Sequence, residues 1–331
     1  MRKTTLLLCA VLPTASACDK TLAYGDPNSI IAVMAPDLWE EVSEDFYQAL
    51  EPTIQTVRDE KTFTVTHQDP RGEYWDRLRR FQQLVVVGTD DDPWVAEALE
   101  AARERPTGPG FLQVYDVWAR GQTVTLIVLA SPGAADEVRA HLEDVHQTLD
   151  RQYRAFARNR MYMSGVDSAL ADTLTAQAGF RLVLPDLYRW SHLDSVYVFR
   201  NDNPDPSELI REIVVSWRTP DNAPLDRETL LAWRATLVQT YYSEPQSVAV
   251  DRGVYGPITH EDRQGYQIQA TWTNPPELNW PAGGPFITRL IACPGQDRVY
   301  LLDSWLYAPG KEKYEYMIQL ETILESFDCG F

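Results

Sequence analysis

Short apolar runs alternate with stretches of helical spacing over the first half of the chain. Residues 29–35 and 84–87 are almost wholly apolar, which is typical of buried strands. Asp37 and Asp92-Pro93 each precede apolar residues at helical spacing and are typical helix starts. In chain order, the pattern predicts a strand at 29–35, a helix from 37, a strand at 63–67, helices at 74–81 and 93–99 on either side of a strand at 84–87, a hairpin of 111–119 and 123–130, and a long helix from 131. Strands that alternate with helices predict an α/β layered domain over residues 29–163.

The second half, residues 164–331, has a different pattern, in which strands follow one another with few helices between them. A helix from Ser168 ends at Gly179, and Asp226 begins another. In chain order, strands are predicted at 180–184, 196–200, 212–217, 248–255, 266–273, 286–293 and 299–307, and a last helix at 311–327. This order predicts an antiparallel sheet covered by helices, so the whole chain is expected to be an α+β protein.

The N-terminus has the order of features of a secretory signal peptide. Arg2 and Lys3 precede an apolar run at residues 6–12, and small residues lead into Cys18. The run is too short for a lasting transmembrane helix, which needs about 20 residues. We therefore predict a signal peptide at 1–17, a polar tether at 18–28, and an exported protein beyond it.

Two enzymes could cut before Cys18. Small residues directly before a cysteine resemble a bacterial lipobox, in which the cysteine becomes lipidated, whereas Ala15 also suits ordinary signal peptidase. Cysteine parity favours the lipobox. Cys9 leaves with the leader, and Cys293 can pair with Cys329, so an unlipidated Cys18 would be a lone exposed thiol. The prediction is a lipid anchor at Cys18 in the bacterial cell envelope, with the inner or outer membrane left open.

The pairing of Cys293 with Cys329 is also a geometric prediction. The strand at 286–293 ends at Cys293, the strand at 299–307 returns to the opposite end, and the helix at 311–327 climbs about 25 Å along the pair. Cys329 should therefore arrive near Cys293. In an oxidising compartment the two are expected to form a disulfide.

Net charge limits the partners of the protein. The chain has 48 acidic and 30 basic residues and a formal charge of −18, with no basic stripe. Such a surface repels nucleic acid and anionic headgroups. We expect no nucleic-acid partner, and membrane contact through the N-terminal lipid.

Two groups of residues resemble metal ligands. Asp90-Asp91-Asp92 could hold a divalent cation, but such a run is more often a solvated turn whose last member begins a helix. His141 and His146 are five residues apart, whereas helical zinc ligands are four apart. We predict no metal site and no cofactor.

A catalytic site could be formed by Asp251, His260 and Asp262, because a carboxylate can orient a histidine for acid–base work. Ser164 lacks the flanking glycines of a nucleophile elbow. An envelope hydrolase using this cluster is the alternative to a non-catalytic protein.

An aromatic-rich loop is the best candidate for a ligand surface. Trp272, Trp280 and Phe286 surround Gly283 and Gly284. Exposed tryptophans can stack on sugars or grip an extended peptide. The competing interpretation is that Trp272 and Phe286 are inward-facing strand residues.

The C-terminal region resembles domain of unknown function family 4837, a family of bacterial envelope lipoproteins with no established activity. The matching residues are Gly283-Gly284-Pro285-Phe286, Leu306-Tyr307-Ala308-Pro309, Lys311, Lys313, Met317 and Gln319-Leu320-Glu321-Thr322-Ile323-Leu324. Three earlier stretches fit in order: Ile31-Ala32-Val33-Met34 with Leu38-Trp39, Val117-Trp118-Ala119, and Leu184-Pro185. The resemblance implies an envelope lipoprotein. The export leader, the absent catalytic signature and the aromatic loop lead us to predict a non-catalytic binding or assembly role, with an envelope protein or a glycan as the partner. A structural spacer without a ligand is the third hypothesis.

Overall fold

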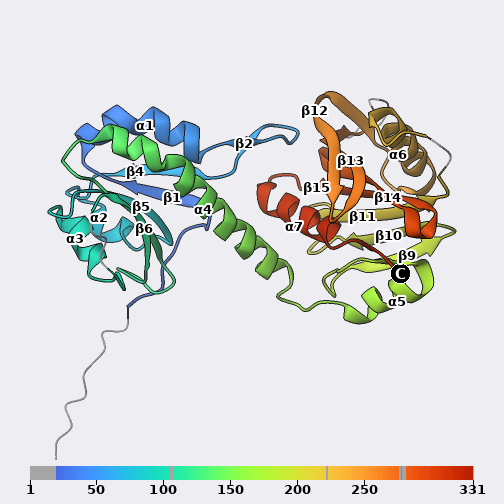
Figure 1. Cartoon of the computed structure of the whole chain (residues 1–331), viewed down its shortest axis with the longest axis horizontal. Coiled ribbons are helices and arrows are strands. Elements are labelled where there is room, and N and C mark those ends of the chain that lie inside the picture. The colour runs from blue at the N-terminus through green and yellow to red at the C-terminus, as the bar shows by residue number, and fades with distance from the viewer. Residues whose placement is uncertain (1–19, 105–107, 221–222, 276, 278–280, 331) are drawn as a thin grey trace, which may run out of the picture. The chain divides into compact units, whose positions relative to one another are not determined.

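The computed structural model describes residues 20–104, 108–220, 223–275, 277 and 281–330 (Figure 1). The predicted signal peptide and Cys18 lie outside these residues. The chain forms two compact units, which are described separately. The first contains residues up to Ser43 and Val65–His141, and the second contains Glu44–Thr64 and Leu142–Phe331.

The first unit is built on a five-stranded sheet. Its strands are β1 (Ser29–Val33), β4 (Thr64–Gln68), β5 (Gln83–Gly88), β6 (Gly110–Tyr115) and β7 (Thr123–Val128), in the order β4-β1-β5-β7-β6. Strands β1, β5 and β7 are parallel, and β6 pairs with β7 as an antiparallel hairpin. The predicted α/β layered architecture is confirmed.

Helices cover both faces of this sheet. On one face, α3 (Pro93–Leu99) and Trp75 of α2 (Trp75–Leu78) pack against the strands. The parts of α1 (Pro36–Leu50) and α4 (Ala135–Met161) that belong to this unit, up to Ser43 and His141, lie on the other (Figure 1). Asp92 lies at the start of α3, and its carboxylate accepts a 2.8 Å hydrogen bond from the backbone N–H of Thr89. Asp92 is thus the N-cap residue of α3, as predicted, but its side chain bonds Thr89 and accepts no hydrogen bond from the first turn of the helix.

The second unit contains a seven-stranded antiparallel sheet. Its order is β12-β13-β14-β15-β11-β10-β9. The strands are β9 (Arg189–Leu193), β10 (Val196–Asn201), β11 (Ile210–Arg218), β12 (Ser247–His260), β13 (Arg263–Thr273), β14 (Gly283–Cys293) and β15 (Arg298–Tyr307). Short strands also pair outside the sheet: β2 (Thr53–Ile54) with β3 (Glu60–Lys61), and β8 (Phe180–Arg181) with β16 (Asp328–Cys329).

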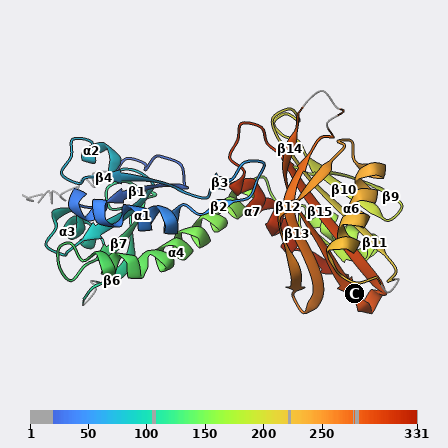
Figure 2. The same cartoon turned by 90° about the horizontal axis from the view of Figure 1, so that it is seen from above.

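Each face of the large sheet has its own helices and its own core. Leu170 of α5 (Ser168–Ala178) and Leu320 of α7 (Tyr314–Glu325) pack on one face, and Leu230 of α6 (Arg227–Tyr241) packs on the other. Helix α6 lies against β13, β14 and β15, and Figure 2 shows it on the opposite side of the sheet from α7. Alternation along each strand therefore divides the side chains between two buried layers. An antiparallel sheet covered by helices was predicted and is confirmed.

Several elements differ from the sequence expectation. Strand β9 was not predicted, because its five side chains are all exposed and carry no apolar pattern. The predicted strand at 180–184 shortens to β8. Strand β12 continues through Pro257, beyond the predicted end at residue 255. It is an edge strand, on which a missing backbone N–H is tolerated.

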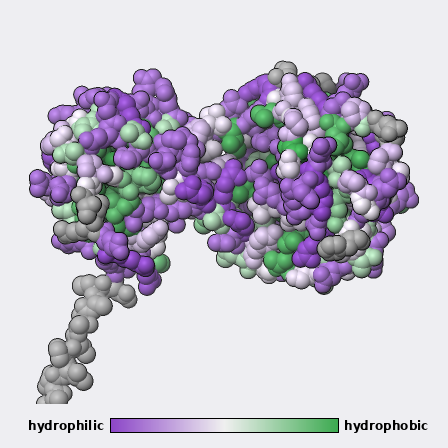
Figure 3. All heavy atoms as spheres, viewed as in Figure 1, coloured by the Kyte–Doolittle hydropathy of each residue, from purple (hydrophilic) through white to green (hydrophobic). Residues whose placement is uncertain are grey.

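The surface of the described residues is mixed in polarity. On the face shown in Figure 3, hydrophilic residues spread over both units and hydrophobic residues show between them in separate patches. Among the helices of the described residues, none is long and apolar enough to cross a bilayer.

The C-terminus returns to the end of the β14–β15 hairpin, as the element lengths predict. Cys293 ends β14 and Cys329 lies in β16, with their Cα atoms 6.1 Å apart, which is disulfide distance.

Candidate ligand-binding site

The residues of the predicted catalytic cluster are not brought together. Asp251 lies on β12 between positions that pair with Thr271 and Gln269, whereas His260 pairs with Arg263. Six or more residues separate these places, which is about 20 Å along an extended strand. The strand register therefore does not assemble the predicted cluster.

His260 and Asp262 also have unrelated surroundings. The His260 ring is buried, with Nε2 2.7 Å from the carbonyl oxygen of Phe327. The Asp262 side chain lies at the exposed hairpin tip, where 91% of it is accessible. A buried ring that is held by a backbone carbonyl and a solvated carboxylate do not make an acid–base pair.

The aromatic loop is largely turned inward. Trp272 and Phe286 are buried, and Trp272 Nε1 donates a 3.2 Å hydrogen bond to the carbonyl oxygen of Leu306. Gly284 lies where the strands approach closely: a Cβ there would be 1.7 Å from the same oxygen. The Gly283 backbone similarly lies against Trp272. Trp280 falls outside the described residues, so the inward interpretation holds for the described aromatic residues.

Trp272 nevertheless lines a cavity of about 380 Å³ in the second unit. This volume lies within the range of small-molecule sites, about 300–1,000 Å³. The lining is mainly apolar and has three polar members. The lining residues are Pro206, Ile210, Trp272, Ala282, Trp305 and Tyr307, together with Arg200, Ser207 and Glu244. We call this cavity the Trp305 pocket.

Arg200 is the centre of the charged part of the Trp305 pocket. Its guanidinium donates hydrogen bonds of 2.9 Å to Glu212 and 2.9 Å to Glu244, and a longer one of 3.4 Å to Asp202. The guanidinium carbon also lies 5.9 Å from the centre of the Trp305 ring. One cation is thus held by three carboxylates and an aromatic face.

Strand register places these groups side by side. Arg200 on β10 is opposite Glu212 on β11, and Glu212 is opposite Trp305 on β15. All three lie on the sheet face that α6 covers. Glu244 comes from the segment after α6, not from a sheet strand, and contacts Arg200.

Glu212 is a buried carboxyl with an unusual proton affinity. Its side chain is 4% exposed. Burial raises the pKa of Glu212 to about 7; the hydrogen bond and charge of Arg200 oppose the rise, and the charge of Glu244 adds to it. One oxygen accepts from Trp305 and the other from Arg200. The carboxyl therefore lies behind the pocket wall and changes charge near neutral pH.

A second buried polar group lies further along the same sheet face. Arg234 of α6 donates a 3.0 Å hydrogen bond to Asp303, and the hydroxyls of Tyr242 and Thr288 also donate to this carboxylate. Burial, and then the charge of Asp303, raise the pKa of Tyr242 well above its ordinary value. The Tyr242 ring is stacked 6.2 Å from Trp305, so the two polar groups are neighbours.

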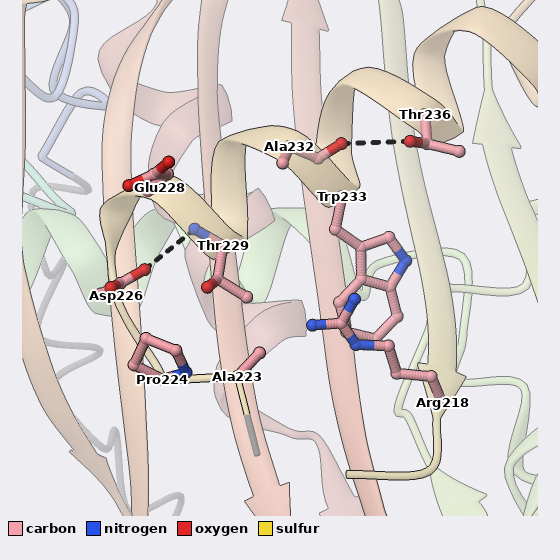
Figure 4. A pocket seen from close by; sticks show the side chains of 9 residues that line it. All are labelled: Arg218, Ala223, Pro224, Asp226, Glu228, Thr229, Ala232, Trp233 and Thr236. Carbon is pink, nitrogen blue, oxygen red and sulfur yellow. Dashed lines mark hydrogen bonds between the residues drawn. The ribbon is translucent and has the colours of Figure 1, made fainter. Parts of the chain in front are cut away.

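Another cavity, of about 550 Å³, lies at the N-terminal end of α6 (Figure 4). Its charged groups serve the local structure. The Arg218 guanidinium lies 4.4 Å from the centre of the Trp233 ring, and Asp226 caps the helix by accepting from the Thr229 N–H at 2.9 Å.

The remaining sequence candidates are scattered. His141 contacts Phe111 in the first unit, and His146 contacts Phe63 in the second. In the part of the chain that the structure describes, no three His, Cys, Asp or Glu side chains gather closely enough to hold a metal ion.

Sequence reasoning missed Arg200, Glu212, Glu244 and Trp305. A signal existed for two of them. Arg200 follows Val196 and Val198 at strand alternation, and Glu212 lies between Ile210 and Val214 in the same way. A charged residue at an inward-facing strand position indicates a buried polar site, because a buried charge needs a partner.

The described residues form a two-unit α+β protein with a cavity of about 380 Å³ beside its antiparallel sheet. Residues 167–326 match the model of the domain of unknown function DUF4837, which confirms the resemblance. Residues 23–162 match another, the domain of unknown function DUF8532. The stretches at 31–34 and 117–119 therefore lie within the second match. The molecular function remains unknown in both families.

Solved structures and curated proteins add little. Two structures, one of a mutant of the protein Mog1 and one of the Saccharomyces cerevisiae Ran-binding protein Mog1p, are each 13% identical with a TM-score of 0.30. Each match covers 46% of this chain, and 91% and 90% of those chains respectively. A likeness at this level carries no argument about fold or function. No curated protein matches the chain.

Proposed function

We propose that this chain is an exported, lipid-anchored envelope protein that works by binding a ligand in the Trp305 pocket, without catalysing a reaction. The address rests on the sequence: the leader at 1–17 and the cysteine at position 18. The placement of Cys293 and Cys329 at disulfide distance supports maturation in an oxidising compartment.

The observation that carries the binding role is the composition of the Trp305 pocket. An apolar lining is combined with a small set of charged groups that the strand register fixes in place. Apolar walls provide affinity and a few fixed polar groups provide orientation, which is the usual design of a ligand site.

Binding fits this geometry better than catalysis. Both oxygens of Glu212 are engaged, and the carboxyl does not line the cavity. Ser207 donates its hydroxyl proton to Asp205 at 2.6 Å, and the described lining contains no histidine to activate it. A nucleophile and a base within reach of each other are therefore lacking among the described lining residues.

The address is tested by intact-mass measurement of the protein from the envelope of its bacterial host. Removal of residues 1–17 and an added acyl mass on Cys18 are expected, and Cys18→Ser should abolish the added mass. Untrimmed protein that starts at Met1 in the soluble fraction would overturn the address.

The binding role is tested by capture from detergent-solubilised envelope with a pocket-filling variant. Ala282→Trp places a large side chain in the Trp305 pocket, and Ala232→Trp does the same in the cavity of Figure 4. We expect wild type and Ala232→Trp to retain a ligand that Ala282→Trp loses. Equal retention by all three, or by none, would contradict ligand binding in the Trp305 pocket.

A further inference from the structure

The charge balance around Arg200 limits the chemistry of the ligand. Three carboxyl groups, those of Asp202, Glu212 and Glu244, contact its guanidinium. The second cation here is Arg189, which lies 2.6 Å from Asp202. With Glu212 ionised, three negative charges face two positive ones. The pKa of Glu212 is about 7, so about half of this excess remains at neutral pH, and a bound cation would favour the ionised carboxylate. An anion would find no guanidinium here that is not already paired with a carboxylate.

The carboxylate that lines the pocket is Glu244, whose oxygens accept hydrogen bonds of 2.9 and 3.1 Å from Arg200 and another from Ser243. Oε1 accepts only one of these bonds, so its second lone pair can accept a hydrogen bond from a ligand. The Glu244 side chain is 19% exposed and lines the pocket, whereas the Glu212 side chain is 4% exposed and does not. A ligand cation in the pocket would therefore contact Glu244 directly and interact with Glu212 only across the wall.

The apolar lining favours a slim aliphatic stem over a sugar ring. Stacking of a sugar needs an accessible aromatic face, but Trp305 is 0% and Trp272 is 1% exposed. Both rings line the pocket together with Ile210 and Tyr307. A methylene chain can lie along such a surface, as lysine stems do in proteins.

Resting on the proposed binding role, we infer that the group recognised by the Trp305 pocket is a primary ammonium on an aliphatic stem, with the ammonium held by Glu244 and the stem lying along Trp305, Tyr307 and Ile210. A lysine side chain of a partner protein and a free alkylamine share this chemistry. The same features disfavour acidic ligands.

The test uses three probes with one stem: n-hexylammonium, n-hexanol and n-hexanoate, titrated calorimetrically into the folded protein. We expect n-hexylammonium to bind most tightly and n-hexanoate not to bind. Glu244→Gln should weaken n-hexylammonium about tenfold, because it removes a charge-assisted hydrogen bond. Glu228→Gln, an exposed residue of the cavity in Figure 4, should leave the affinity unchanged.

Two tripeptide amides separate the sources, acetyl-Ala-Lys-Ala and its leucine counterpart. Binding of the lysine peptide in addition to n-hexylammonium supports a protein partner, and binding of n-hexylammonium alone supports a free amine. The inference is overturned if n-hexanoate or n-hexanol binds as tightly as n-hexylammonium, if Glu244→Gln has no effect, or if no probe binds. The capture experiment with Ala282→Trp judges the binding role separately, since a ligand of another class could still be retained there.

Discussion

The indole nitrogen of Trp305 donates a 3.1 Å hydrogen bond to Glu212, the residue directly opposite it on the neighbouring strand. Arg200, opposite Glu212 on its other side, donates to the second carboxylate oxygen at 2.9 Å. Three strands that are neighbours in the sheet, β10, β11 and β15, thus contribute one residue each to a row across it. The row fixes a carboxyl group in the core that can change charge near neutral pH.

The pKa of Glu212 predicts how stability depends on pH. In the unfolded chain the pKa is about 4.5, and burial raises it to about 7 in the folded protein. Between these values the folded protein keeps a proton that the unfolded chain releases. The contribution to stability is therefore complete below about pH 4.5 and is lost as the pH rises through 7, by up to about 3 kcal/mol.

Urea unfolding of wild type and Glu212→Gln between pH 5 and 8 measures this contribution. The amide cannot ionise, so the fall in unfolding free energy should be smaller for the variant, with the difference growing up to about pH 7. Glu228→Gln, on the exposed surface, should follow wild type. Parallel pH curves for wild type and Glu212→Gln would show that the carboxyl titrates as it does in the unfolded chain.

The buried pair of Arg234 and Asp303 predicts a strong coupling. Their side chains are 1% and 0% exposed. Arg234→Met leaves the carboxylate buried without its cation and should cost about 3–5 kcal/mol of unfolding free energy. Asp303→Asn leaves the guanidinium without its anion and should cost a similar amount.

A double-mutant cycle isolates this interaction. Arg234→Met combined with Asp303→Asn should lose less than the two single changes together, by about 1–3 kcal/mol, because the second substitution removes the charge that the first left unpaired. Thermal or urea unfolding of the four proteins gives the value. Strict additivity would mean that the two groups are not coupled.

Gly284 is required by a close approach of strands. A methyl group there would lie 1.7 Å from the carbonyl oxygen of Leu306, so Gly284→Ala must push β14 away from β15. We expect a loss of about 1–3 kcal/mol or more. Gly256→Ala is the matched control: it lies in strand β12 with nothing within 4 Å of the added Cβ, and it should be neutral or slightly stabilising. Equal stability of the two variants would contradict the close approach.

The fold was predictable because it depends on local periodicity. The apolar run that becomes β5, the helix start at Asp92 and the alternation along β10 are each visible within a few residues of sequence. The elements that were missed have no such local signal. Strand β9 is wholly exposed, and the two-residue strands β8 and β16 exist because distant segments meet.

The pocket was not predictable because it depends on register between distant segments. Glu212 and Trp305 are 93 residues apart, and Glu244 comes from a segment outside the sheet strands. Their types and spacing show no motif. Moving the pairing of an antiparallel strand by one residue would turn its side chains to the other face. The sequence marks Arg200 and Glu212 as charges that need partners, and the three-dimensional register decides which partners they find.

The last prediction concerns Cys293 and Cys329, which lie 36 residues apart in sequence with their Cα atoms 6.1 Å apart. In the chain-entropy model, a bond that closes a loop of this length stabilises the folded state by about 3–4 kcal/mol. In a chain beginning at Asp19, thiol titration after denaturation without reductant should find no free thiol, and reductant should lower the denaturant midpoint. The Cys293→Ser/Cys329→Ser variant is the control: it should be as unstable as the reduced protein and indifferent to reductant. Two titratable thiols in untreated protein would show that the cysteines stay unbonded. An unchanged midpoint on reduction would show the same, because opening a closed loop increases the conformational entropy of the unfolded chain and must lower stability.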